Sequence, residues 1–175
     1  MDNKDHIVNL HATAVNIYDY GVLITGDSGI GKSELALDLV ARGHKFISDD
    51  SVSIKNTNNG LEISAQKDAI GYIHVRGLGF IHIDKMYNNV CSIMENSNLE
   101  LIVELVNDNS LLNKELLSPL LDHLEILNTP IPRFKLPIGT NRNLAILSEI
   151  IVKYHHQLKN GYDSNKEFIQ RMNKP

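Results

Sequence analysis

The residues best suited to chemistry form a short glycine-rich segment that ends in lysine and serine. It matches the pattern G-x-x-x-x-G-K-[ST] without a mismatch and runs Gly26-Asp27-Ser28-Gly29-Ile30-Gly31-Lys32-Ser33. Glycines permit backbone angles that turn successive N–H groups inward, and the N-terminus of a following helix favours anions. In such a loop the lysine reaches the β- and γ-phosphates of a nucleotide, and the serine hydroxyl ligates magnesium. These eight residues therefore predict a nucleotide site, with Lys32 on the phosphates and Ser33 on the metal.

The flanking sequence predicts the strand and the helix that this loop requires. The run Tyr20 to Thr25 is typical of a buried strand, and Ser33 to Arg42 has apolar residues at helical spacing. Gly43 is the expected C′ residue of that helix. A short strand over 45–48 then ends at the pair Asp49-Asp50. A glycine-rich turn that binds no ligand is the alternative, and the strand, loop and helix together argue against it.

The remaining pattern predicts one mixed α/β domain over residues 1–175. Further strands are expected over 10–18, 51–55, 61–64, 70–75, 80–83 and 99–106, with a hairpin signal at Asn59-Gly60. Helical hints over 111–124 are interrupted by Pro119, and Pro130 and Pro132 mark an extended stretch. An amphipathic helix is expected over 143–159, and Asp163 or Ser164 could cap a last helix that runs towards Met172.

The composition of the chain argues against several classes of protein, among them nucleic-acid-binding, membrane-spanning and disulfide-rich proteins. The 175 residues are 42% hydrophobic and 22% charged, which suits one globular domain with a sizeable core. The net charge of −4 and the lack of a long basic run argue against nucleic acid as a partner. No run approaches the roughly 20 apolar residues of a membrane span. Cys91 is the single cysteine, which excludes an internal disulfide and a multi-cysteine zinc site. A cytoplasmic location is therefore expected.

Several short segments occur in an order that narrows the choice among proteins with such a loop. They are Leu10-His11-Ala12-Thr13, the loop Gly26 to Glu34, Arg42-Gly43-His44, Ser48-Asp49-Asp50, Arg76-Gly77-Leu78-Gly79 and Gly139 to Ala145. Together they resemble HPr kinase/phosphorylase, from about Leu10 to about Asp163. The histidine before the loop and the aspartate pair after the helix are more specific than the loop alone.

The resemblance implies a P-loop kinase domain of the phosphoenolpyruvate carboxykinase-like type. That fold has a mixed central sheet with flanking helices and further helices at the C-terminal end. Longer members of the family carry an additional N-terminal domain, and this chain resembles the short members that consist of the catalytic domain only. The implied enzyme uses ATP to phosphorylate a serine of HPr, the phosphocarrier of the sugar phosphotransferase system. It also removes that phosphate with inorganic phosphate, giving pyrophosphate, and it is expected to form a homohexamer.

The resemblance implies catalytic roles for Asp50 and His11, and the loop pattern implies one for Lys32 on the phosphates. Asp50 matches the aspartate that accepts the serine proton and returns it in the reverse reaction, His11 matches the active-site histidine, and Lys32 belongs to the loop. From the residues alone, Asp49-Asp50 is either a magnesium-binding pair or a turn, and a lone histidine such as His11 is more often structural. A solvated or packing role is expected for the other histidines considered, His44, His82, His123, His155 and His156.

Two positions depart from the family pattern. His74 stands where the family has a glutamate that ligates magnesium, and imidazole is a poor magnesium ligand, so manganese becomes more plausible. No arginine stands near Lys114, where the family places one; Arg76 and Arg142 are other candidates for contacting phosphate, or they are surface ion-pair partners. The segment 137–142 matches only partly a segment that the family uses in dephosphorylation.

Two other functions remain open from the sequence. One is a P-loop kinase that acts on a small molecule, although the arginine-rich lid expected of such an enzyme is not evident. The other is a nucleotide-binding regulatory protein whose kinase site has partly decayed, which would agree with His74 and the missing arginine. Transfer of phosphate to HPr, transfer to metabolites, or ATP binding without turnover would separate the three.

Overall fold

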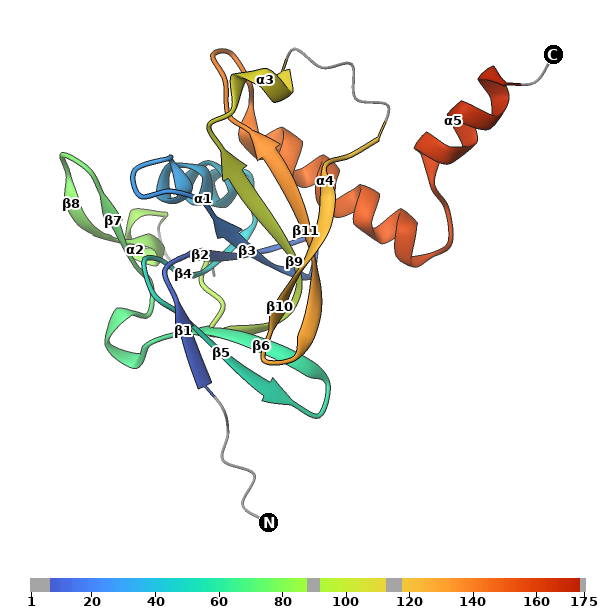
Figure 1. Ribbon diagram of the computed structural model, residues 1–175. Coiled ribbons are helices and arrows are strands. Elements are labelled where there is room, and N and C mark those ends of the chain that lie inside the picture. Colours follow the sequence, from blue (N-terminus) through green and yellow to red (C-terminus); the bar gives the residue numbers. More distant parts are fainter. Residues whose placement is uncertain (1–6, 88–91, 113–117, 174–175) are drawn as a thin grey trace.

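The computed structural model describes residues 7–87, 92–112 and 118–173 (Figure 1). Within these residues nine strands form one mixed sheet, and two others form a separate hairpin. The strands are β1 Ile7–Leu10, β2 Thr13–Ile17, β3 Tyr20–Thr25, β4 Lys45–Ser48, β5 Val52–Thr57, β6 Gly60–Ala65, β7 Tyr72–Val75, β8 Gly79–His82, β9 Asn96–Val106, β10 Leu121–Ile126 and β11 Thr129–Pro137. The helices are α1 Lys32–Ala41, α2 Ile83–Met86, α3 Asn109–Leu112, α4 Leu144–Lys159 and α5 Ser164–Met172, with a 3₁₀ turn at Lys67–Ala69.

The long strand β9 joins the parts of the sheet. It pairs antiparallel with β6 at its beginning, parallel with β3 along most of its length, and parallel with β11 at its end. Strand β2 is antiparallel to both β3 and β4, so β4 runs in the same direction as β3. The carboxyl ends of β3, β4, β9 and β11 therefore meet at one edge of the sheet, where α/β proteins bind ligands.

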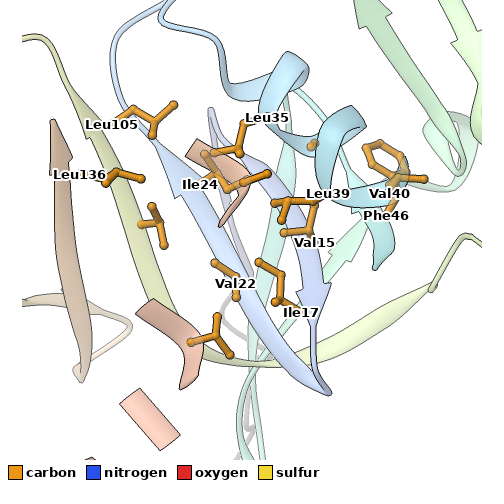
Figure 2. Close-up of a cluster of buried hydrophobic side chains, with 14 of the residues drawn as sticks. Val15, Ile17, Val22, Ile24, Leu35, Leu39, Val40, Phe46, Leu105 and Leu136 are labelled. Carbon is orange, nitrogen blue, oxygen red and sulfur yellow. The ribbon is translucent and has the colours of Figure 1, made fainter. Parts of the chain in front are cut away.

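Apolar side chains fill both faces of this sheet. On one face α1 and α4 pack against the strands, and Figure 2 shows Leu35 and Leu39 of α1 beside Ile24 and Val15. On the other face a second cluster, which includes Leu23, is enclosed by β5 and β6. Alternate residues of β3 point to opposite faces, as the two-residue period of a strand requires. The strand that precedes the glycine-rich loop is therefore buried on both sides, and it fixes the start of the loop.

Most of the predicted elements are present. Strand β3 has the expected bounds, α1 begins one residue earlier than expected, and the helix ends so that Gly43 lies at C′ as predicted. In the β5–β6 hairpin Thr57 pairs with Gly60, so the two turn residues are Asn58 and Asn59. The predicted Asn59-Gly60 signal therefore lies at the turn. Helix α4 is capped by the Asn143 side chain and α5 by that of Asp163, the first of the two predicted caps.

The predicted helical character of residues 111–124 holds for Leu111 and Leu112, the end of α3, and is wrong for residues 121–124, which are in a strand. Helix α3 ends at Leu112, and β10 begins at Leu121, where it pairs antiparallel with β11. Alternate residues of β10 are exposed, so the segment has the period of a strand and not that of a helix. Residues 113–117 lie outside the described part of the chain.

The predicted extended stretch around two prolines is part of a strand. Pro130 and Pro132 lie in β11 before its pairing with β9 begins, so their missing N–H groups leave that parallel ladder intact. The predicted extended stretch is thus confirmed.

Among the helices of the described residues, none combines the length and the apolar character that crossing a membrane would require.

Candidate functional site

A cleft of about 560 Å³ lies at the carboxyl edge of the sheet. One wall is the glycine loop, residues 26–33, together with the start of α1. The other wall is formed by residues that follow β1 and β4 and by the β7–β8 hairpin. The side chains that matter for its chemistry are His11, Lys32, Ser33, Asp50, His74 and Arg76. The structure thus brings together the predicted catalytic residues and most of the glycine loop.

Two glycines of the loop have positive φ angles and closely approaching neighbours. A Cβ atom at Gly26 would lie 2.6 Å from the backbone oxygen of Leu105 in β9, and φ at Gly26 is +134°. At Gly29, where φ is +77°, a Cβ would lie 3.0 Å from a guanidinium nitrogen of Arg76. L-residues rarely adopt these angles. The loop is therefore shaped by β9 on one side and approached by Arg76 on the other.

Lys32 is buried, and its ammonium is held by the loop itself. Its Nζ donates hydrogen bonds of 3.0 Å to the backbone oxygens of Gly26 and Asp27. Only 5% of the residue is exposed to solvent. A buried ammonium whose partners are neutral carbonyls is well placed to bind an anion, because its positive charge has no carboxylate partner there. No ion pair of Lys32 is found among the described residues.

Asp49 is the buried centre of a hydrogen-bond network beneath the loop. The Thr13 hydroxyl donates to Oδ1 over 2.7 Å, and the Ser33 hydroxyl lies 3.0 Å from both carboxylate oxygens. The backbone N–H of His74 donates to Oδ2 over 3.3 Å. Because β3 and β4 are parallel in direction, the aspartate at the end of β4 and the serine after the loop meet at the same edge.

The oxygen atoms of Ser33 and Asp49 fit a hard cation. The Ser33 proton points to Asp49, so the lone pairs of Ser33 Oγ stay available, and magnesium prefers such oxygen donors. His74 lines the cleft, with its ring tilted against that of Phe80 at a centroid distance of 5.0 Å. No group of three or more His, Cys, Asp or Glu side chains with metal-binding spacing is found in the described residues. A cation here would therefore depend on Ser33, Asp49, phosphate and water.

Asp50 and His11 stand together at the exposed side of the cleft. The His11 Nδ1 atom lies 3.0 Å from the backbone oxygen of Asp50 and 4.0 Å from its carboxylate Oδ1. A carbonyl oxygen only accepts, so Nδ1 carries the proton. Both side chains are more than half exposed, at 58% and 64%. Asp50 also has φ of +62°, an uncommon angle for a residue other than glycine and one that often marks functional sites.

The arginine candidates differ in their placement. Arg76, in the turn of the β7–β8 hairpin, points across the cleft to Gly29. Arg142 is outside this cleft, and its guanidinium donates to the backbone oxygen of Pro137 over 2.7 Å. Neither forms a salt bridge within the described part of the chain, so the ion-pair alternative gains no support. Lys114 and Cys91 lie outside the described residues.

A second cluster of charged side chains lies at the other end of α1. Arg42 donates to both carboxylate oxygens of Glu149, over 2.8 and 2.7 Å, and His44 Nε2 lies 2.8 Å from Oε1. Glu149 and His44 are buried. The hydrogen bonds from Arg42, and then those from His44, lower the pKa of Glu149 to about 2. The cluster ties the end of α1 to the middle of α4.

The other histidines have the packing or solvated positions that were expected. His44 is buried beside Tyr18, and His155 is buried beside Tyr20 and Phe134, where burial lowers its pKa. His82 packs against Tyr72, whereas His123 and His156 are exposed.

Sequence reasoning missed three contributors. Thr13 belongs to a segment that the sequence singled out, but its contact with Asp49 needs the pairing of β2 with β4. The other two are contacts between residues that are far apart in the chain: Arg76 approaches Gly29, and Glu149 pairs with Arg42. No local sequence pattern predicts such contacts.

Comparisons with known proteins agree on one family. The model of the HPr Serine kinase C-terminal domain matches residues 5–172. The HPr kinase/phosphorylase of Thermoanaerobacter sp. is 33% identical over 94% of this chain and 54% of its own length. That of Treponema pallidum is 36% identical over 93% of this chain and 51% of its own length. The chain thus spans about half the length of the curated relatives it matches.

A solved structure extends this agreement to the fold. The structure of the HPr(Ser) kinase/phosphatase from Coxiella burnetii has a TM-score of 0.81 and 37% sequence identity to this chain. The match covers 92% of this chain and 98% of that one. The mixed α/β arrangement is therefore that of a P-loop kinase, as the sequence predicted.

Proposed function

The chain belongs to the family of HPr serine kinase C-terminal domains, and from this premise we propose that it transfers the γ-phosphoryl group of ATP to a serine of HPr. We propose further that it removes the same group with inorganic phosphate. The observation that carries the proposal is the position of Asp50 and His11 beside the glycine loop in one cleft.

In the forward direction Asp50 acts as the general base. It accepts the proton of the serine hydroxyl while the serine oxygen forms a bond to the γ-phosphorus and the bond from that phosphorus to the β-phosphate oxygen breaks, which releases ADP. Lys32 and the N–H groups of the loop hold the phosphates. His11, through its Nδ1 proton, holds the backbone of Asp50 and thereby positions the carboxylate. Arg76 reaches the loop at Gly29, where its charge would balance that of the phosphates.

In the reverse direction the same groups exchange roles. An oxygen of inorganic phosphate attacks the phosphorus of phosphoserine, the bond to the serine oxygen breaks, and Asp50 returns the proton to that oxygen. The products are serine and pyrophosphate. One carboxylate suffices for both directions, because an acid that gives a proton in one direction takes it in the other.

Magnesium, or manganese, would be held by Ser33 and by water that Asp49 orients. When bound, such an ion neutralises charge on the phosphates. His74 supplies an imidazole where the family resemblance implies a carboxylate, so the cation affinity of this chain is expected to be lower than with a third oxygen donor.

The wider expectations belong to the same proposal. They are a single catalytic domain over residues 1–175, a homohexamer, a cytoplasmic location, and HPr, ATP, phosphate and pyrophosphate as partners. They are supported by the family and by the motifs in the chain.

The test is a two-stage assay with purified protein. HPr and γ-labelled ATP are supplied with magnesium or manganese, and excess inorganic phosphate is then added. We expect label on an HPr serine, followed by its release as labelled pyrophosphate. Binding of ATP without labelling of HPr would favour the regulatory protein with a decayed site, and labelling of a metabolite would favour the small-molecule kinase.

A further inference from the structure

The turn that carries Asp50 has a strained backbone. Strand β4 ends at Ser48 and β5 begins at Val52, so only Asp49, Asp50 and Ser51 join the two strands. The Ser51 N–H donates to the backbone oxygen of Asp49 over 2.7 Å, and φ of Asp50 is +62°. A hydrogen bond from a residue to the second residue before it closes a γ-turn, and the kind with positive φ at its central residue is rare and strained.

Two other pairs of residues with positive φ have a simpler cause. Tyr18 and Asp19 join β2 to β3, and Leu127 and Asn128 join β10 to β11, each pair forming the centre of a two-residue hairpin turn. Such turns commonly require positive φ at both positions. Strands β4 and β5 are not neighbours in the sheet, so no hairpin imposes the angle at Asp50. The cause must therefore lie in the groups that surround the turn.

The side chain of Ser48 closes this turn from below. Ser48 is fully buried at the end of β4, and its hydroxyl donates to the backbone oxygen of Ser51 over 2.8 Å. This bond spans both aspartates, so it fixes the distance between the two ends of the turn. A buried hydroxyl is costly to leave without a partner, which favours the closed turn further.

Two further hydrogen bonds hold the turn from the solvent side. His11 Nδ1 donates to the backbone oxygen of Asp50 over 3.0 Å, and Gln66 Nε2 donates to Ser51 Oγ over 3.0 Å. Both His11 and Gln66 are exposed, so water competes for these contacts. The bond from Ser48 lies on the buried side of the turn, and we expect it to be the most persistent of the three.

We propose that Ser48 is a positioning residue for phosphoryl transfer, an inference that rests on the proposed function. Its hydroxyl keeps the turn closed and Asp50 at positive φ, the conformation in which Asp50 lines the cleft beside Lys32. Without that hydroxyl the turn can relax towards the negative φ that most residues prefer, and the direction of the Asp50 side chain changes with it. Because Ser48 is fully buried, it would touch neither nucleotide nor HPr and acts through Asp50.

The experiment removes the hydroxyl and measures which step is lost. Ser48→Ala should lower the maximal rates of HPr phosphorylation and of phosphorolysis by a similar factor, roughly 10-fold, with the KM and the dissociation constant for ATP nearly unchanged. Ser148→Ala in α4 is the matched control. Ser148 is 1% exposed, and its hydroxyl donates to the backbone oxygen of Leu144 over the same distance, 2.8 Å. This control should keep the wild-type rates.

A double-mutant cycle separates positioning from a general loss of structure. In the Asp50→Asn background the base is already absent, so the addition of Ser48→Ala should change the remaining rate by less than about two-fold. If Ser48→Ala keeps the wild-type rates, or slows both backgrounds equally, the inference is overturned. If Ser48→Ala does not fold, the exposed Gln66→Ala replaces it. That variant should be about two- to three-fold slower than Lys67→Ala, its control, and equal rates would overturn the inference.

Hydrogen exchange tests the turn without any need for activity. The Ser51 amide should exchange slowly in the wild type, because it is bonded to Asp49, and about ten-fold faster in Ser48→Ala. Ser148→Ala should leave this amide as it is in the wild type. Equal exchange in Ser48→Ala and wild type would mean that the hydroxyl does not hold the turn. Failure of the proposed function looks different, since the wild type would then label no HPr serine, whatever the exchange at Ser51.

Discussion

Two histidine–carboxylate pairs lie at opposite ends of the same helix, and they differ in almost every physical respect. At the N-terminal end of α1, His11 and Asp50 are largely exposed, with 4.0 Å between Nδ1 and Oδ1. At the C-terminal end, His44 and Glu149 are 6% and 11% exposed, and their closest atoms are 2.8 Å apart. The carboxylate of the first pair is open to solvent in the cleft. The second has both carboxylate oxygens occupied by Arg42 and His44.

The difference shows that residue type alone does not assign a role. A carboxylate whose oxygens are saturated by buried donors stabilises the fold, because removing it strands those donors. A carboxylate on a residue with a left-handed backbone angle, exposed in the cleft beside the glycine loop, is expected to contribute little to stability and is accessible to a ligand. Mutations at the two pairs should therefore separate activity from stability.

The largest expected effect is at Asp50. Asp50→Asn should lower the rates of serine phosphorylation and phosphorolysis by roughly 10²–10⁴-fold, because a general base is lost in both directions. ATP affinity and the free energy of unfolding should change little. Rates with HPr and ATP binding by calorimetry measure this. Asp19→Asn is the control, since Asp19 is also exposed with a positive φ, of 68°, but lies outside the cleft. An equal loss of ATP binding would contradict the role as base.

The second effect, at Glu149, is on stability. Glu149→Gln removes the charge that Arg42 and the buried His44 both bind, and it should lower the free energy of unfolding by about 1–3 kcal/mol. For a domain of this size that corresponds to roughly 2–4 °C in Tm per kcal/mol. Urea and thermal unfolding measure the change, with Glu125→Gln on the exposed side of β10 as the control. If Glu149→Gln left the free energy of unfolding unchanged but abolished phosphoryl transfer, the roles assigned to the two pairs would have to be exchanged.

A smaller effect should appear in the pH dependence of that same variant. The pKa of Glu149 is lowered from 4.5 to about 2 in the folded protein. Its contribution to stability is therefore present above pH 4.5 and is lost as the pH falls towards 2. The stability gap between wild type and Glu149→Gln should be full at about pH 6 and clearly smaller at about pH 3. Asp122, whose pKa is lowered by Arg133, is present in both proteins, so its effect cancels. A gap that stays constant with pH would mean that the charge of Glu149 does not matter.

The smallest expected effect concerns a third histidine, His74, in the cleft. His74→Glu adds an oxygen donor near Ser33 and Asp49, and it should lower the magnesium concentration for half-maximal rate by roughly 3- to 10-fold. A magnesium titration of the phosphorylation rate measures this, with His123→Glu on exposed β10 as the control. An unchanged titration would show that position 74 does not take part in binding the cation.

The sequence predicted the parts of the site that are local in the chain. The glycine loop, its strand and helix, and the aspartate pair after β4 are short patterns with a physical reason for each residue. The role of Thr13, the reach of Arg76 and the partners of Glu149 depend on how distant segments meet, so the sequence alone could not supply them. Strand β10 was misread because Pro119 and several leucines obscured a two-residue period. The catalytic roles of His11, Lys32 and Asp50 stay predictions until the variants are measured.

The contact between Gly26 and Leu105 has a consequence for the synthesis of the protein. The start of the glycine loop lies directly against the end of β9, and β3 forms its parallel ladder with the same strand. During translation β3, the loop and α1 leave the ribosome long before β9 does. A nascent chain that stops short of Val106 has no strand to shape the loop from that side, and pairings between distant segments form slowly. Nucleotide should therefore begin to bind the growing chain, and thereby stabilise it, only after β9 has emerged.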